Sequence, residues 1–105
     1  MQPRLIDALR HSYCTAVAAG NEYSVVITDE GGLYTFGVGR HGQLGHGDTR
    51  DQTLPKRVDT FAHKALLAAA GLTHTLVVCQ SGGLFAFGDD LNLGIDFGEH
   101  RRHRI

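Results

Sequence analysis

Three glycines near the middle of the sequence have a spacing that could hold a phosphate group. Gly37, Gly39 and Gly42 read G-x-G-x-x-G directly after the apolar stretch LYTF. In a dinucleotide-binding enzyme, this spacing lets backbone amides approach a pyrophosphate at the first turn of a helix. The residues that follow, QLGHGDTRDQTLP, contain two glycines and a proline, which disfavour a helix. We therefore interpret these glycines as turn glycines and expect no nucleotide cofactor.

Histidine and cysteine side chains offer further chemistry, but each lacks the partners that its chemistry needs. His41, His46 and Asp48 lie close together, whereas a zinc site uses four ligands, usually with tighter Cys or His pairs. Cys14 and Cys79 would each need a positioned base to act as nucleophiles. We expect the loop histidines to face solvent or bond backbone, and we expect no metal, no cofactor and no enzyme active site.

The overall composition is that of a globular chain. Its 105 residues are 42% hydrophobic and 20% charged, with a net charge of −1. This near-neutral balance argues against electrostatic binding of nucleic acid across the whole surface. One dense basic run, His100–Arg104, could make a weak contact with nucleic acid or with an acidic partner, and a solvated tail is the alternative.

Glycine and cysteine usage, together with the N-terminal sequence, points to a compartment and a general shape. The 14 glycines are about twice the number that average usage predicts, which indicates many tight turns. The two cysteines lie far apart and define no disulfide framework. No window approaches the ~20 apolar residues of a membrane span. We expect a soluble cytoplasmic or nuclear protein with no membrane partner.

The chain contains two copies of one segment, offset by 51 residues. Residues 18–37, AAGNEYSVVITDEGGLYTFG, align with residues 69–88, AAGLTHTLVVCQSGGLFAFG, and nine positions are identical. A repeat of this length indicates a repeat architecture and takes precedence over any short motif. We predict a first repeat at residues 1–54 and a second at residues 55–105, the second degenerate after Gly88.

Each copy has the pattern of antiparallel strands. YSVVIT and HTLVVC are rich in β-branched residues, and the glycine pair after each of them suits a hairpin turn. FAHKALLAAA has high helix propensity and would make the fold α+β. Because ALLAAAG occupies the place of CTAVAAG in the first copy, we predict a strand at residues 66–70. A short helical turn upstream stays open. The predicted fold class is all-β.

The order of these residues resembles the repeat of the regulator of chromosome condensation family. The departures are Tyr23, where the family pattern usually has histidine, and the stretch GQLGHGD, which survives only in the first copy. We assign structural roles in the repeat to these residues: Gly20, Tyr23, Gly31, Gly32, Phe36, Gly37, Gly42, Gln43, Leu44, Gly45, Gly47 and Asp48 in the first copy, and Gly71, His74, Gly82, Gly83, Phe87 and Gly88 in the second.

The resemblance implies a β-propeller, usually of seven blades, in which each repeat contributes about one four-stranded blade. Two antiparallel blades make an incomplete propeller, since repeat folds generally need at least three units. We expect the chain to be a fragment of a larger propeller. The alternatives are that it packs onto copies of itself or that a partner covers it.

The expected function is a non-catalytic protein–protein interaction module, with the remaining propeller blades or another protein as partner. The resemblance also implies two alternatives. One is part of a guanine-nucleotide exchange factor for a Ran-type small GTPase, with chromatin association. The other is the substrate-recruiting propeller of a ubiquitin ligase. Fold alone does not choose between them.

Overall fold

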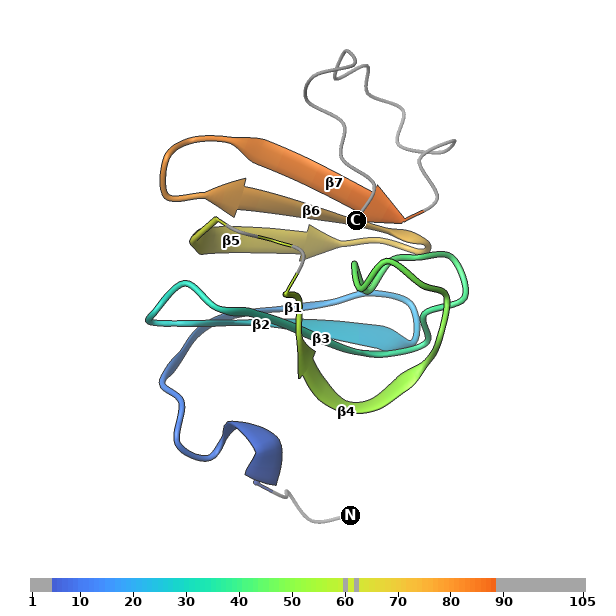
Figure 1. Ribbon diagram of the computed structural model, residues 1–105, viewed down its shortest axis with the longest axis horizontal. Coiled ribbons are helices and arrows are strands. Elements are labelled where there is room, and N and C mark those ends of the chain that lie inside the picture. Colours follow the sequence, from blue (N-terminus) through green and yellow to red (C-terminus); the bar gives the residue numbers. More distant parts are fainter. Residues whose placement is uncertain (1–4, 60, 62, 89–105) are drawn as a thin grey trace.

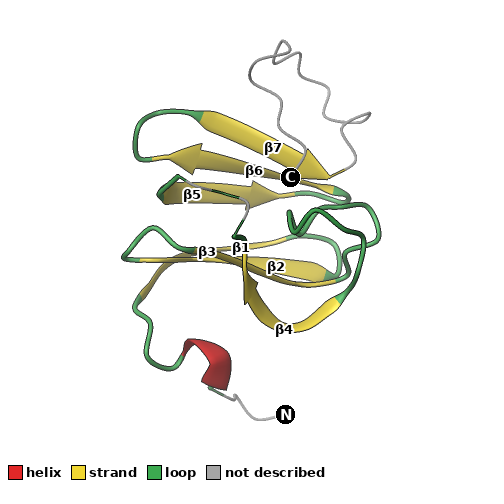
Figure 2. Ribbon diagram, in the orientation of Figure 1, coloured by secondary structure: helices red, strands yellow, loops and turns green. Residues whose placement is uncertain are grey.

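The structure is a computed structural model that describes residues 5–59, 61 and 63–88. This part of the chain contains strands and one 3-10 turn, without an α-helix (Figure 2). The elements are η1 (Asp7–Leu9), β1 (Cys14–Ala19), β2 (Tyr23–Thr28), β3 (Leu33–Gly37), β4 (Gln52–Arg57), β5 (Ala65–Ala70), β6 (His74–Cys79) and β7 (Leu84–Gly88). The all-β prediction is confirmed.

The strands form two antiparallel sheets, one from each repeat. The first sheet has the order β1-β2-β3-β4 and the second the order β5-β6-β7. The first strand of each sheet has its register shift at the same place, between Cys14 and Ala16 in β1 and between Ala65 and Leu67 in β5. The duplication therefore extends from the sequence to the irregularities of the backbone.

The region of high helix propensity folds as strand β5. Its alanines and leucines pair with β6 over the whole span, from Ala65 opposite Cys79 to Ala70 opposite Thr75. The helical alternative for this segment is therefore wrong, because pairing in a sheet outweighs the small helix preference of each residue. A short turn of 3-10 helix, η1, forms upstream of β1.

The hairpin turns match between the sheets. Thr28 N donates to Gly32 O at 3.0 Å, and Cys79 N donates to Gly83 O at 2.8 Å. The first glycine of each pair has positive φ, as the turn requires. Strand β4 includes Pro55. Proline has no backbone N–H, and an edge strand tolerates it because only one side of that strand pairs with a neighbour. The first sheet thus extends past the start of the second sequence repeat, and the repeat boundaries stay a prediction.

The two sheets pack against each other, and β5 lies next to β1 and β2 (Figure 1). A single apolar cluster joins them: Tyr23, Val25, Ile27, Leu33, Leu44, Val58, Phe61, Ala65, Val77, Cys79 and Phe87. Within the described ranges, no helix has the length and apolar character needed to cross a membrane. The predicted degenerate segment after Gly88 and the basic run His100–Arg104 lie outside these ranges.

Candidate interaction site at the sheet junction

Alternation along the strands gives each sheet two faces with distinct roles. Successive residues of a strand point to opposite sides, and directly paired residues share a side. In the first sheet, we call the side that packs against the second sheet the forward face. In the second sheet, we call the side that packs against the first sheet the rear face. The equivalent side of the other sheet takes the same name in each case. Forward positions are Ala16, Ala18, Tyr23, Val25 and Ile27 in the first sheet and Leu67, Ala69, His74, Leu76 and Val78 in the second. Rear positions are Val17, Ala19, Ser24, Val26 and Phe36 in the first sheet and Ala68, Ala70, Thr75, Val77 and Phe87 in the second.

The loop that follows β3 crosses from the first sheet to the second and is anchored by a hydroxyl on each side. Thr35 Oγ1 donates to Leu44 O at 2.6 Å, and Thr75 Oγ1 donates to Gln43 O at 2.7 Å. Both threonines are fully buried. Because a buried carbonyl without a donor is costly, these two bonds stabilise the position of the loop between the sheets.

Gly45 brings the loop into contact with Phe87. A Cβ added at Gly45 would lie 2.7 Å from Cε2 of Phe87, so only glycine allows this approach. Gly47 has nearly the same positive φ, and a Cβ there would meet nothing within 4 Å. The two glycines of this stretch thus serve different purposes. The first permits packing across the junction, and the second satisfies only the backbone.

Tyr23 makes the largest set of polar contacts across the junction. Its hydroxyl donates to the backbone carbonyl of His74 and accepts from the N–H of Gly71 at 3.1 Å. The hydroxyl of Thr75 lies 3.1 Å away, in the same network. Burial raises the pKa of Tyr23, and the bonds with Thr75 and Gly71 oppose that rise. One phenol of the first sheet therefore contacts two backbone groups and one side chain of the second repeat.

His74 occupies the place of Tyr23 in the second sheet but faces away from the first. Its Nδ1 is buried and has no hydrogen-bond partner among the described residues. The ring packs against Gly71, whose added Cβ would lie 3.1 Å from Cε1. At the equivalent position of the first sheet, Tyr23 binds backbone groups of the second repeat.

The other residues assigned to the repeat lie in turns, at strand ends or in the anchored loop. Asp48 Oδ1 accepts from Arg50 N at 3.1 Å, which closes a local turn. Positive φ occurs at Gly31, Gly37, Gly42, Gly45, Gly47, Gly82 and Gly88. Gly20 and Gly71 begin the turns before β2 and β6, and Gly32 and Gly83 precede β3 and β7. Their structural role in the repeat remains our proposal.

His46 is engaged in the loop anchor. Its Nε2 lies 2.9 Å from Thr35 Oγ1, whose single hydrogen points to Leu44 O. Nε2 must therefore carry the hydrogen and donate to Thr35. Partial burial lowers the pKa of His46, and Lys56 lowers it further, while Asp48 acts in the opposite direction. The lowered pKa favours the neutral form of the imidazole.

The described residues show no constellation suited to catalysis or to metal binding. No group of three or more His, Cys, Asp or Glu residues gathers around one point in this part of the chain. Cys79 is buried, and burial raises the pKa of its thiol, which disfavours the reactive thiolate. No helix follows Gly42, and Gly39 N already donates to Asp51 Oδ1 at 2.9 Å, so the stretch G-x-G-x-x-G forms no phosphate cradle.

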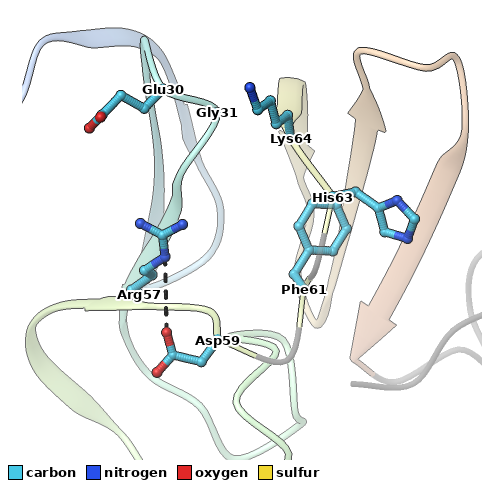
Figure 3. A pocket seen from close by; sticks show the side chains of 7 residues that line it. All are labelled: Glu30, Gly31, Arg57, Asp59, Phe61, His63 and Lys64. Carbon is cyan, nitrogen blue, oxygen red and sulfur yellow. Dashed lines mark ion pairs between the residues drawn. The ribbon is translucent and has the colours of Figure 1, made fainter.

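A cleft of about 440 Å³ opens where the β2–β3 turn approaches the link to β5 (Figure 3). Arg57 and Asp59 lie on the same side of the cleft, with 4.0 Å between Nε and Oδ1, and both are largely exposed. Its lining is Glu30, Gly31, Arg57, Asp59, Phe61, His63 and Lys64. Acidic and basic side chains alternate around the opening, so the cleft has no net preference for an anion or a cation.

Several residues that decide the junction were missed by sequence reasoning. Thr35 lies inside LYTF and was not distinguished from its neighbours, although its bond to Leu44 fixes the loop. Ser24 and Thr75 hold equivalent positions in the two repeats, but only Thr75 lies between the sheets and is fully buried. The signal available in the sequence was the hydroxyl that Ser24 and Thr75 share, at the same rear position of both repeats.

Comparison with known proteins agrees with the arrangement of the sheets. A family model described as Regulator of chromosome condensation (RCC1) repeat matches residues 30–78, and a second model of the same description matches residues 14–43. Human E3 ubiquitin-protein ligase HERC2 is 38% identical over 101 residues, which is 93% of this chain and 2% of HERC2. The chain therefore spans a small part of this relative.

Solved structures give the same result. Human WBSCR16 superposes with a TM-score of 0.67 and 31% identity, over 71% of this chain and 19% of that one. Prp20p from Saccharomyces cerevisiae, described together with its binding properties to Gsp1p and histones, gives 0.67 and 25%, over 75% of this chain and 21% of its own. With two repeat models matched in succession and two sheets that superpose on such repeats, this chain belongs to the regulator of chromosome condensation (RCC1) repeat family.

Proposed function

We propose that the chain is a non-catalytic protein–protein interaction module, part of a larger β-propeller. The observation that carries this proposal is the pair of open faces. The rear face of the first sheet exposes Val17 to 75%, and the forward face of the second exposes Leu67 to 57%. Exposed apolar surface of this kind marks a site for another protein surface.

The relatives support a role in binding rather than chemistry. HERC2 is named a ligase, yet the segment that matches this chain is 2% of its length. Within the described residues, the buried polar side chains of the junction hold backbone groups, as Thr35 and Thr75 do. A soluble cytoplasmic or nuclear location is part of this proposal.

Exchange of guanine nucleotide on a Ran-type small GTPase is the second candidate. The observation that favours it is the structural likeness to Prp20p, whose binding to Gsp1p and histones has been described. In this candidate the chain contributes blades to an exchange factor. A substrate-recruiting propeller of a ubiquitin ligase would use the same open faces, as the likeness to HERC2 suggests.

Two measurements on the purified chain test the module. At high dilution the open faces should bind a hydrophobic dye, and a chain carrying Val17→Asp and Leu67→Asp together should bind much less. The release of a fluorescent guanine nucleotide from a Ran-type GTPase should be unchanged by the chain. A chain that binds no dye would contradict the proposal, and accelerated release would replace it with the exchange factor.

A further inference from the structure

The two open faces of the chain are the two halves of its own buried junction. Inside the chain, a forward face packs on a rear face, with Val25 and Ile27 against Val77 and Phe87 in one cluster. Among the described residues no sheet packs on the forward face of the second sheet or on the rear face of the first, where Leu67 and Val17 are largely exposed although Ala86 and Val26 are buried. We propose that these faces bind each other between two copies of this chain, head to tail, with His74 in the place that Tyr23 holds inside the chain.

The proposed contact between two copies is equivalent to the junction inside the chain but differs from it at the innermost strands. Strands β1 and β5 are in contact, and Ala16 of β1 and Ala68 of β5 both pack against the apolar cluster of the junction. In a contact between copies, Leu67 stands in the place of Ala16 and Val17 in the place of Ala68. Both side chains are largely exposed in the single chain, so both gain contact on assembly. Their greater size holds the joined strands further apart than β1 and β5.

The polar groups of the junction have counterparts on the open faces. Tyr23 binds His74 O, Gly71 N and the Thr75 hydroxyl. On a second copy, the matching groups are Tyr23 O, Gly20 N and the hydroxyl of Ser24. The turn is the same, since Gly20 N donates to Tyr23 O at 2.9 Å and Gly71 N donates to His74 O at 3.0 Å. His74, the counterpart of Tyr23, is half-buried on the forward face of the second sheet, and its buried Nδ1 has no hydrogen-bond partner among the described residues.

A groove beside Phe36 shows that the open rear face is hollowed. The groove has a volume of about 690 Å³, and Leu5, Ile6, Phe36 and Leu54 are among its lining residues. Phe87, the counterpart of Phe36, has Gly45 packed against it from the preceding repeat. The groove lies between the N-terminal residues 5–8, strand β4 and Phe36, so this part of the rear face is hollowed and partly covered by the N-terminal segment.

A head-to-tail contact uses two different surfaces of each copy, which makes the assembly heterologous. This gives a test that a symmetric dimer would fail. Val17→Asp spoils only the rear face, and Leu67→Asp spoils only the forward face. Each variant alone should be monomeric in sedimentation velocity. A mixture of the two should form a one-to-one dimer, because each retains the face that the other lacks.

Matched controls keep this result interpretable. Leu72 is an exposed leucine in the β5–β6 turn, so Leu72→Asp adds the same charge away from the strand faces and should sediment like the unaltered chain. His74→Phe keeps a ring but removes the nitrogen, and should weaken association about three- to tenfold. Circular dichroism melting checks that each variant is folded, as expected for substitutions at exposed sites.

Three results would overturn the inference. They are an unaltered chain that stays monomeric at every accessible concentration, a Val17→Asp or Leu67→Asp chain that still dimerises alone, and a mixture that stays monomeric. The inference rests on the proposed function, because it names a partner for the module. A monomeric chain that still binds hydrophobic dye would overturn self-association and leave the interaction module standing with a different partner. A monomer that binds no dye would end both.

Discussion

Phe36 and Phe87 occupy the same position in the two repeats and lie in different surroundings. Phe87 is 2% exposed, between the sheets and against Gly45. Phe36 is half-buried beside an open groove. The repeat fixes the type of residue, whereas the neighbouring unit decides how far it is buried. In a repeat protein of this kind, much of the stability therefore belongs to the junction rather than to either sheet.

Truncating each of the two phenylalanines is the strongest test of whether the neighbouring sheet sets their contributions to stability. Phe87→Ala should lower the free energy of unfolding by about 3–5 kcal/mol, because it leaves a cavity in the only apolar cluster that spans the two described sheets. Phe36→Ala should cost about 1–2 kcal/mol, since its side chain is already partly hydrated. Urea unfolding followed by circular dichroism measures both losses.

Equal losses at the two positions would show that burial by the neighbouring sheet does not govern their contributions. Where Phe87→Ala leaves too little folded protein for a baseline, Phe87→Leu against Phe36→Leu gives the same comparison with smaller losses.

Gly45 and Gly47 give the next largest contrast. Both have positive φ, near 80°, so alanine brings a similar backbone strain of about 1 kcal/mol at either place. At Gly45 the new Cβ also meets the ring of Phe87, while at Gly47 it meets nothing within 4 Å. Gly45→Ala should therefore cost about 2–4 kcal/mol and Gly47→Ala about 1 kcal/mol. Chemical unfolding would refute the packing role of Gly45 if the two variants were equally stable.

Strands β1–β3 and β5–β7 could be predicted from the sequence because each of them occurs in both copies of the repeat, whereas β4 lies outside the aligned segments and was not predicted. The segment at β5 shows this most clearly. Its alanines and leucines favour a helix individually, and only the alignment with β1 indicated a strand. Turn glycines such as Gly31 and Gly82 were predictable for the same reason, since a hairpin needs a positive φ at that point.

The junction could not be predicted from the sequence alone. Alternation shows that Ser24 and Val26 share one side of a strand, but not which side meets a neighbouring sheet. That choice depends on the path of the link from β4 to β5 and on the loop that Thr35 anchors. Tyr23 was noted as a departure from the family pattern, and its contacts with the second sheet make it the main polar link between the sheets.

Two tyrosines of the first sheet sharpen the contrast between its faces. Tyr23→Phe removes the hydroxyl that accepts from Gly71 N and donates to His74 O, so it should cost about 1–3 kcal/mol. Tyr34 lies half-buried on the rear side, opposite Val26, and its hydroxyl makes no hydrogen bond within the described residues. Tyr34→Phe should change the free energy of unfolding by less than about 0.5 kcal/mol. A loss at Tyr34 as large as that at Tyr23 would place an unrecognised polar contact on the rear face.

The smallest expected effect is a pH dependence that comes from the anchored loop of the first repeat. Partial burial and Lys56 lower the pKa of His46 in the folded chain below its ordinary value of 6.5. Below about pH 6.5 the unfolded chain therefore binds more protons at this site than the folded chain does. The stability that His46 contributes is complete above that pH and is lost as the pH falls toward the folded pKa.

This loss comes from charging a half-buried ring, not from breaking the bond to Thr35, because Nε2 carries a hydrogen in both the neutral and the protonated imidazole. His46→Gln keeps an N–H donor at this place and does not titrate. Urea unfolding at a series of pH values should give a decline below about pH 6.5 that is shallower in His46→Gln than in the unaltered chain. Parallel profiles for the two proteins would mean that the imidazole is as free to protonate in the loop as it is in the unfolded chain, and that the anchor between the sheets leaves it in contact with water.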